Sequence, residues 1–328
     1  MPAPDLSVSA TSAVRVAATC LWTGPDAPRE IDAPIVAAVP DPRGWAAGLD
    51  VPARRDLDDR VLTQLLAGEP VEVLEERGDW LRVVAPWQPS DLDPRGYPGW
   101  VPRAHVAQAA APARREAVVT VESVHLEPDP ESGRDDLPAE LTYATILPVL
   151  AEPGDAESTG STQAGSTEAG LGPRVRVALP GGGSGWVDAR ACTVRPTGDG
   201  AQVRAEAVLA EARRFVGLPY LWGGMSAFGL DCSGLVHIAF RALGRIVPRD
   251  AHDQAEAAKR VPAGEARPGD LYFFARPEKS IHHVGFADGP GSDGTLLHAP
   301  GTGQQIREEQ MTADRLTTLL DLAGRLAD

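Results

Sequence analysis

Glycine and proline constrain what this chain can fold into more than any other feature of its sequence. The 328 residues include 34 Gly and 30 Pro, about a fifth of the chain, where average usage gives about 12%. Both residues destabilise the interior of a helix. This excludes long helical bundles and favours turns that join short strands. At about 150 residues per domain, the length predicts two domains and leaves room for three small ones.

Charge and hydropathy exclude further classes of protein. The formal net charge is −15, from 46 acidic and 31 basic residues, whereas nucleic acids and anionic membranes attract clusters of Lys and Arg. No apolar run approaches the ~18 residues of a membrane span, and residues 1–5 resemble no leader peptide. We expect neither a nucleic-acid nor a membrane partner. We expect a cytoplasmic location, or the cell envelope if a leader was removed; the sequence indicates no oligomeric state.

Residues 14–110 have the pattern of a small β-rich domain that follows an N-terminal tail, residues 1–13. Short apolar runs separated by Gly, Pro and Asp predict strands at residues 13–22, 70–74, 80–84 and 97–101. Residues 26–60 show no clear period, and we interpret them as an insertion that could carry short helices.

Residues 111–198 have the same β-rich pattern. Strands are expected at residues 117–121, 144–150, 174–179 and 185–187. Gly185-Trp186-Val187 resembles Gly99-Trp100-Val101, which favours two copies of one small barrel. Residues 152–172 are rich in Gly, Ser, Thr, Ala and Glu, and we predict that this loop is disordered.

Residues 199–328 have a different character. Apolar residues at helical spacing predict two helices, 203–216 and 232–243, and Gly217 and Gly244 mark their ends. Strand-like runs follow at residues 270–275, 281–287 and 295–299. Helices followed by a sheet indicate an α+β domain, so the predicted fold class is α+β with two small all-β barrels in front.

Cys232 is the candidate nucleophile. The cysteines Cys20, Cys192 and Cys232 are odd in number and form no C-x-x-C pair, so at least one thiol is free. Cys232 lies where a Gly-rich loop turns into the second predicted helix, and the helix dipole with its unpaired N–H groups stabilises a thiolate there. We therefore expect Cys232 to be the one thiol with strongly acid-shifted reactivity. The alternative is a buried structural cysteine.

Two histidines supply the expected partners of this thiol. Alternation along strand 281–287 places His283 and His282 on opposite faces, so that His283 can face the helix. His298 lies in the next strand, which completes a nucleophile, base and orienter. A structural role for each histidine is the alternative, and we interpret His237 and His252 as structural or surface residues.

A zinc ion held by Cys232, His283 and His298 is chemically possible. No short-spaced ligand pair supports that site, so we expect no metal and no cofactor. Tyr220 and Trp222 precede the nucleophile in the Gly-rich loop, where they can wall a small cleft. Tyr220 also offers its hydroxyl to the reacting carbonyl. The alternative for both aromatics is an ordinary place in the core.

Six motifs in this last domain resemble those of the NlpC-type cysteine peptidases of bacterial cell walls, in order and spacing, over about 80 residues. They are Leu218-Pro219-Tyr220-Leu221-Trp222-Gly223-Gly224, Asp231-Cys232-Ser233-Gly234-Leu235-Val236, Pro248-Arg249-Asp250-Ala251, Arg267-Pro268-Gly269-Asp270-Leu271, His283-Val284-Gly285-Phe286 and Leu297-His298-Ala299. The resemblance implies a papain-like fold. It also implies that Cys232, His283 and His298 are the catalytic residues.

The N-terminal motifs extend this resemblance. Residues 63–66, 68–71 and 96–101 are similar to the first bacterial SH3-like barrel of a subgroup that cleaves γ-D-glutamyl-diamino acid bonds in peptides with a free N-terminal L-Ala. In that subgroup an aromatic residue of the barrel closes the cleft and an acid beside the nucleophile holds the amine, which implies these roles for Tyr97 and Asp231. Glu69 and Gln64 are candidates for a further contact from the barrel.

Other residues of the motifs bear on specificity. Ser233 and Arg249 complete the expected substrate-binding set, and Ala251 stands where the subgroup often has Ser, which affects selectivity more than catalysis. The Asp231 carboxylate would raise the pKa of the adjacent thiol, so we expect a substrate cation to neutralise it. The alternative is that Asp231 only caps the helix.

The expected function is hydrolysis of the γ-D-glutamyl-diamino acid bond of murein peptides with a free N-terminal L-Ala, in peptidoglycan recycling. The diamino acid can be diaminopimelate or lysine. Alternatives are a secreted endopeptidase that acts on intact peptidoglycan, a non-catalytic wall-binding protein, and a papain-like amidase or acyltransferase, since the triad leaves the acyl acceptor open.

Overall fold

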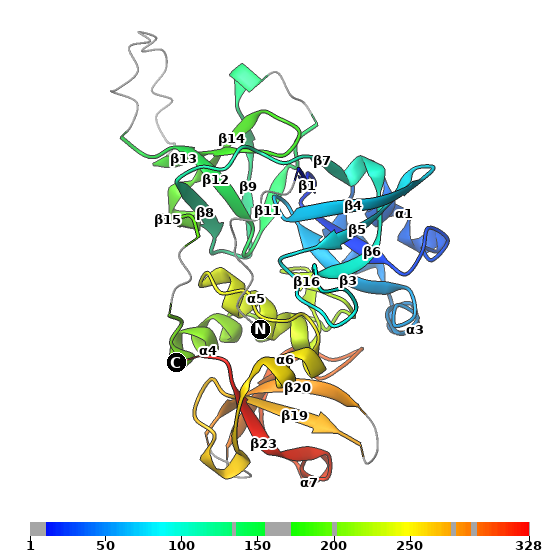
Figure 1. The fold of residues 1–328 in the computed structure, drawn as a ribbon, viewed down its shortest axis with the longest axis vertical. Helices are drawn as coiled ribbons and strands as arrows, with labels where there is room; N and C mark the ends of the chain where they lie inside the picture. Colours follow the sequence, from blue (N-terminus) through cyan, green and yellow to red (C-terminus); the bar gives the residue numbers. More distant parts are fainter. Residues whose placement is uncertain are drawn as a thin grey trace.

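The computed structural model describes residues 11–132, 136–154, 172–198, 202–276, 280–289 and 294–327. Two β-rich regions precede a C-terminal region of helices on a sheet. Helix α5 (Cys232–Ala242) lies between the first β-rich region and the C-terminal sheet (Figure 1). Within these residues, no helix has the length and apolar character of a membrane span.

The first region is an antiparallel sheet with the strand order β3-β2-β6-β5-β4-β1-β7. Its elements are β1 (Ser12–Val14), β2 (Ala18–Trp22), β3 (Val61–Leu66), β4 (Pro70–Arg77), β5 (Trp80–Ala85), β6 (Tyr97–Pro102), η2 (Arg103–His105) and β7 (Val106–Gln108). The single strand predicted at 13–22 is wrong, because the chain changes partners there: β1 pairs with β4 and β7, and β2 pairs with β3 and β6. Strand β3 was missed because it is buried along nearly its whole length and shows no alternation.

The insertion between β2 and β3 carries short helices, as the sequence suggested. They are η1 (Glu30–Asp32), α1 (Ala33–Val36), α2 (Pro42–Gly48) and α3 (Val51–Arg55). Asp41 and Asp50 accept hydrogen bonds from the first-turn N–H groups of α2 and α3, which fixes where these two helices begin. Trp45 of α2 packs against Cys20 and Trp22 of β2, so the insertion covers one side of the first sheet.

The second region, residues 111–198, contains a sheet with the order β10-β14-β13-β12-β8-β15 and a separate pair, β11-β9. The elements are β8 (Arg115–Val119), β9 (Ser123–His125), β10 (Glu127–Pro128), η3 (Pro130–Ser132), β11 (Glu140–Thr142), β12 (Ile146–Ala151), β13 (Arg174–Ala178), β14 (Ser184–Asp188), η5 (Ala189–Ala191) and β15 (Cys192–Pro196). The short strands β9, β10 and β11, and β15, were not predicted. Most of the loop expected to be disordered, residues 155–171, lies outside the described residues.

The C-terminal region has an antiparallel sheet with the order β18-β23-β19-β20-β21-β22. Its elements are α4 (Ala205–Arg213), β16 (Met225–Ser226), β17 (Gly229–Leu230), α5, α6 (Ala251–Ala257), β18 (Lys259–Pro262), η6 (Ala263–Glu265), β19 (Leu271–Ala275), β20 (Ile281–Asp288), β21 (Thr295–His298), β22 (Arg307–Gln310), α7 (Ala313–Leu316) and β23 (Leu319–Arg325). Helix α5 and strands β19 to β21 agree with the sequence analysis. The helix predicted at 203–216 is the shorter α4. Helices α6 and α7 and strands β16, β17, β18, β22 and β23 were not predicted.

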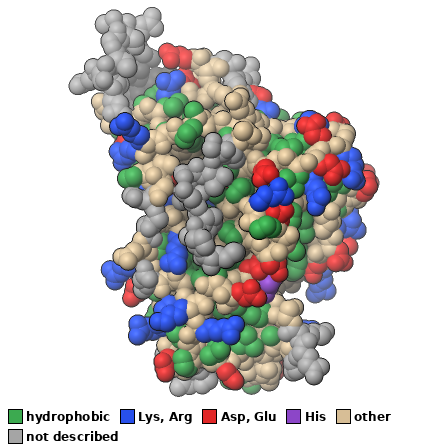
Figure 2. Space-filling model, viewed as in Figure 1, with side chains coloured by type: hydrophobic (Ala, Val, Ile, Leu, Met, Phe, Trp, Pro, Cys, Tyr) green, Lys and Arg blue, Asp and Glu red, His purple; other side chains and the backbone are tan. Residues whose placement is uncertain are grey.

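Helix α5 is held by an apolar core. Leu235 and Ile238 of the helix pack in one cluster with Val284, Phe286 and Leu297 of the sheet. At the surface, acidic and basic side chains are interspersed over the first β-rich region on the face shown in Figure 2. On this face, the acidic side chains that give the chain its net charge of −15 therefore form no single patch over the first region.

Candidate active site

Cys232 is the first residue of helix α5, as the sequence predicted. Asp231 is the N-cap, and its side chain accepts a hydrogen bond from the Gly234 N–H at 2.6 Å. The approach to the helix is tight: a Cβ on Gly234 would lie 2.3 Å from the carbonyl oxygen of Gly224. The Gly-rich sequence thus lets the loop pass directly over the first turn of α5. Cys232 itself is half-buried.

The thiol of Cys232 is not acid-shifted in this structure. Burial raises the pKa of Cys232 to about 12, helped by the neighbouring Asp231 carboxylate, while hydrogen bonds from the backbone of Val284 and Ser233 and the charge of Arg249 oppose the rise. The expectation of an acidic thiol is therefore wrong for this structure. The helix start is present, but desolvation and an adjacent carboxylate outweigh its N–H groups.

His283 and His298 meet as expected from strand alternation. His283 is 6% exposed and His298 is fully buried, whereas His282 is exposed. His283 Nε2 lies 2.8 Å from His298 Nδ1. Val284, whose backbone contacts the Cys232 sulfur, follows His283 directly in β20.

Both imidazoles are neutral near pH 7. Burial, and then electrostatic interactions with His298, Arg315 and His282, lower the pKa of His283 well below its usual value. Burial and Arg315 lower the pKa of His298 to about 3, although Glu309 acts in the opposite direction. A neutral imidazole can accept a proton, so His283 is chemically suited to act as a base.

Asp231 does more than cap the helix. Arg249 binds it with two hydrogen bonds, Nη1 to Oδ1 at 3.0 Å and Nη2 to Oδ2 at 2.6 Å. The Gly223 N–H donates to Oδ2 at 2.9 Å, and Arg249 Nη1 donates to Ser233 Oγ at 2.9 Å. The argument that only a substrate cation could neutralise Asp231 is therefore wrong, because the buried Arg249 already does so.

Of the predicted aromatic residues, Tyr97 and Tyr220 lie near Asp231, whereas Trp222 contacts the first region. Tyr97 of β6 donates its hydroxyl hydrogen to Asp250 Oδ2 at 2.9 Å, so it reaches from the first region to the segment that carries Arg249. Tyr220 is 6% exposed; burial and the nearby Cys232 hold the pKa of its hydroxyl well above the usual value. Trp222 is partly exposed, and its Nε1–H donates to the Val61 carbonyl at 2.9 Å.

Glu69 and Gln64, the candidates for a further substrate contact, both form contacts within the protein. Gln64 Oε1 accepts hydrogen bonds from Met225 N–H and Ser226 Oγ, both at 3.0 Å, in the loop before the nucleophile. Glu69 is fully buried and forms an ion pair with Arg241 of α5 at 2.6 Å. Both side chains therefore join the first region to the C-terminal region and have their oxygens occupied within the protein.

A buried chain of hydrogen bonds links the two ends of α5 through the first region. Arg249 Nε donates to Thr63 Oγ1 at 2.8 Å, and Thr63 Oγ1 donates to Gln88 Oε1 at 2.7 Å. Gln88 Nε2 then donates to Glu69 Oε1 at 2.8 Å, and Glu69 binds Arg241. Sequence reasoning missed Gln88 and Arg241, because no local pattern marks partners that are 19 to 186 residues apart.

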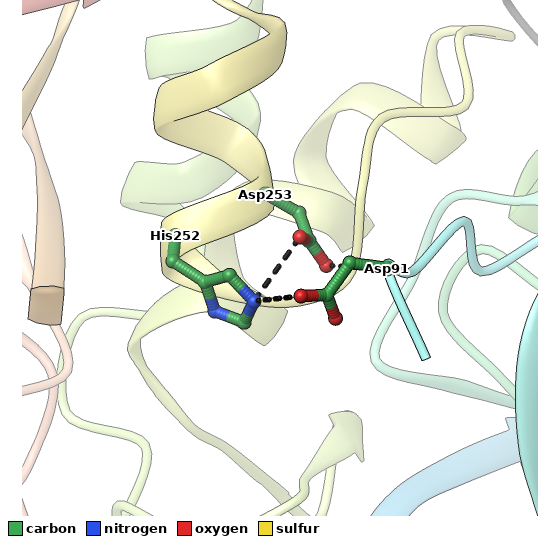
Figure 3. Close-up of side chains that lie close together, drawn as sticks. All are labelled: Asp91, His252 and Asp253. Carbon is green, nitrogen blue, oxygen red and sulfur yellow. Dashed lines mark hydrogen bonds and ion pairs between the residues drawn. The ribbon is translucent and has the colours of Figure 1, made fainter. Parts of the chain in front are cut away.

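A second cluster of charged groups lies where the first region meets α6 (Figure 3). His252 Nε2 lies 3.3 Å from Asp91 Oδ2 and 3.1 Å from Asp253 Oδ1. Each of these three residues offers an atom that could hold a metal ion. Both acidic groups lie within contact distance of His252, and we interpret the cluster as a polar contact between the first region and α6, in agreement with the surface role expected for His252.

Comparison with known proteins places this geometry in a family. The NlpC/P60 family profile matches residues 217–324, and the bacterial SH3 domain profile matches residues 48–107. The chain is 35% identical to a gamma-D-glutamyl-L-lysine dipeptidyl-peptidase of Bacillus subtilis, over 87% of this chain and 88% of that protein. It is 32% identical to a protein of the same name from Bacillus cereus, over 89% and 84%.

The fold agrees with these sequence matches. A crystal structure of an NlpC/P60 family protein from Bacillus cereus superposes with a TM-score of 0.83 at 28% identity, covering 97% of this chain and all of that one. The N-terminal domain is thus SH3-like and the C-terminal region has the NlpC/P60 fold. This chain belongs to the NlpC/P60 family of cysteine peptidases.

Proposed function

We propose that this protein hydrolyses the bond between a γ-D-glutamyl residue and the following L-diamino acid in peptides derived from peptidoglycan. The relatives named gamma-D-glutamyl-L-lysine dipeptidyl-peptidase support the bond and favour lysine as the diamino acid. The observation that carries the chemistry is the His283–His298 pair, because the residue after His283, Val284, contacts the Cys232 sulfur through its backbone.

In the proposed mechanism the Cys232 sulfur attacks the γ-carbonyl carbon while its proton passes to His283. The Cys232 N–H, at a helix start where N–H groups lack helical partners, and the Tyr220 hydroxyl stabilise the oxyanion. The resulting imidazolium protonates the leaving amine, and a thioester remains. Water then attacks the thioester and gives a proton to His283. The C–S bond breaks, the acid is released, and the Cys232 sulfur takes the proton back from His283. Because the thiol starts out protonated, proton transfer and attack occur together.

We propose that the cleft also requires a free amine on the N-terminal L-Ala. Asp231, Arg249 and Asp250 lie together, and their formal charges leave one negative charge unbalanced beside Tyr97. A substrate ammonium would supply the missing positive charge. Acetylation of that amine would lower kcat/KM, by about thirty- to several-thousand-fold if the contact is worth about 2 to 5 kcal/mol.

The test compares L-Ala-γ-D-Glu-L-Lys, its diaminopimelate analogue, their N-acetylated forms and intact peptidoglycan, with mass spectrometry of the products. Cleavage of the free peptides alone, and loss of all cleavage in Cys232→Ala, supports the proposal. Efficient cleavage of acetylated peptide or intact wall would instead favour the endopeptidase alternative. Asp231→Asn and Asp250→Asn, measured with both forms of the peptide, show which carboxylate discriminates between them.

We also infer that residues 111–198 form a second SH3-like domain. Trp186 of β14 lies under the guanidinium groups of Arg174 and Arg176, as Trp100 of β6 lies under Arg77. An experimental structure in which β8 and β12 to β15 do not superpose on the first domain would contradict this. A location inside the cell stays a prediction, which fractionation of expressing cells tests.

A further inference from the structure

The row of hydrogen bonds that begins at His283 does not end at His298. His298 Nε2 lies 3.0 Å from Oε1 of Glu309, on strand β22. The Glu309 carboxylate is itself held in place: Arg315 Nε donates to Oε1 at 2.8 Å, and Arg307 Nε donates to Oε2 at 2.7 Å. Its side chain is only 19% exposed. Three groups on three elements, β21, β22 and α7, therefore meet at this carboxylate.

The direction of each hydrogen bond in this row follows from the Glu309 carboxylate at its end. A carboxylate held by two guanidinium groups only accepts hydrogen bonds, so His298 Nε2 must carry the proton. A neutral imidazole has one N–H, which leaves a lone pair on His298 Nδ1. His283 Nε2 must then donate to that lone pair. The remaining lone pair is on His283 Nδ1, which is the nitrogen free to take a proton from Cys232.

We infer that Glu309 is a positioning residue that sets the tautomers of His298 and His283. It does not touch the substrate, and it acts two hydrogen bonds away from the proton that moves. The inference rests on the proposed roles of Cys232 and His283 and adds a residue to them. Without Glu309, His298 could carry its proton on Nδ1. That N–H would face the N–H of His283, and repulsion between the two would rotate the His283 ring away from Cys232.

The acceptor oxygen of Glu309, more than its charge, is expected to matter. The charged groups that face the two imidazoles are Glu309 and Arg307 on β22 and Arg315 on α7, and exposed His282 adjoins them on β20. Two positive charges already outnumber the carboxylate. A glutamine should keep its oxygen at the Oε1 position, because an NH₂ group there would face two donors, Arg315 Nε and His298 Nε2, whereas at the Oε2 position it faces only Arg307 Nε.

The first test is the tautomer itself, measured by ¹⁵N NMR of histidine-labelled full-length protein. We expect Nε2–H on both His283 and His298 in the unmodified protein and in Glu309→Gln. In Glu309→Ala we expect His298 to lose its single tautomer. An Nδ1–H tautomer at either histidine of the unmodified protein overturns the inference, and so does an unchanged tautomer in Glu309→Ala.

The second test is kinetic. Loss of the group that orients a metal-ligating histidine typically costs about 10- to 100-fold in metal affinity or activity. We take the same range for His283, so Glu309→Ala should lower kcat by about that factor with little change in KM. Glu309→Gln should stay within about threefold of the unmodified enzyme. The matched control is Glu308→Ala, an exposed neighbour paired with Arg213, which should have no effect. Equal losses in Glu309→Gln and Glu309→Ala overturn the role of the acceptor.

These outcomes are distinct from a failure of the proposed function. If Cys232→Ala keeps its activity, the peptidase assignment fails, whatever the tautomers are. If Cys232 is essential and Glu309→Ala has normal kcat, only the role of Glu309 fails. If Glu309→Ala does not fold, the NMR spectrum of the unmodified protein and the kinetics of Glu309→Gln still test the role of Glu309.

Discussion

The buried ion pair between Glu69 and Arg241 should make the first domain essential to the stability of helix α5. Both side chains have no exposed surface. Glu69→Ala removes the counter-charge of Arg241 and also the acceptor for Gln88 Nε2 and for the Leu66 N–H. The Arg241 guanidinium also lies 5.1 Å from the Trp87 ring, but a ring does not replace a carboxylate.

Removing one partner of a buried ion pair costs about 3 to 5 kcal/mol, because the other charge stays buried without compensation. A cooperative unit of about 150 to 250 residues loses about 2 to 4 °C per kcal/mol, so the midpoint of thermal unfolding should fall by about 6 to 20 °C. Activity should fall at temperatures where the unmodified enzyme is stable, since α5 carries Cys232 at its other end.

The assay is thermal unfolding followed by circular dichroism, with urea unfolding as a second measure. The matched control is Glu72→Ala, whose ion pair with Arg95 is about half exposed; an exposed pair contributes about 0 to 1 kcal/mol. The double variant Glu69→Leu/Arg241→Met should regain most of the stability, because a buried pair can be replaced by apolar groups. A loss below about 1 kcal/mol in Glu69→Ala, or a double variant as unstable as the sum of its parts, would refute the reasoning.

Three further predictions follow from the pKa shifts and the strand register. Because the pKa of the Cys232 thiol is raised to about 12, alkylation by iodoacetamide in the absence of substrate should be slow at pH 6 and rise about tenfold per pH unit to at least pH 9; a rate already constant at pH 6 to 7 would contradict this. His283→Ala should abolish turnover as fully as Cys232→Ala, whereas His282→Ala keeps most of it, and comparable losses in both histidine variants would show that the base is misassigned. Burial, with Arg241 and Arg249, lowers the pKa of His237 to about 3, so the unfolded chain binds a proton below pH ~6.5 that the folded chain does not. Stability should therefore fall from about pH 6.5 to pH 3, and His237→Leu should reduce that slope by about 1.4 kcal/mol per pH unit in urea unfolding at several pH values; an unchanged slope would count against the assignment.

Local features of the sequence predicted much of the catalytic region. The Gly-rich loop before Cys232 and the apolar spacing after it identified helix α5 to within one residue. Alternation in β20 separated buried His283 from exposed His282. Both patterns are read within about ten residues, because helix and strand periods are properties of neighbouring side chains. Strand β22 has the sequence Arg-Glu-Glu-Gln with no apolar period, so neither it nor Glu309 could be recognised in the same way.

The sequence by itself therefore predicted that an SH3-like region precedes the NlpC/P60 region, that a helix begins at Cys232, and that His283 and His298 face inward on neighbouring strands. Only the tertiary structure decided what surrounds them. Arg249 reaches Asp231 and Thr63, and Arg241 reaches Glu69, across up to 186 residues of chain. The pKa of Cys232 depends on how completely the folded protein removes it from water. Desolvation and long-range ion pairs depend on atoms that come together only when the chain folds. No local pattern of residues can therefore predict them.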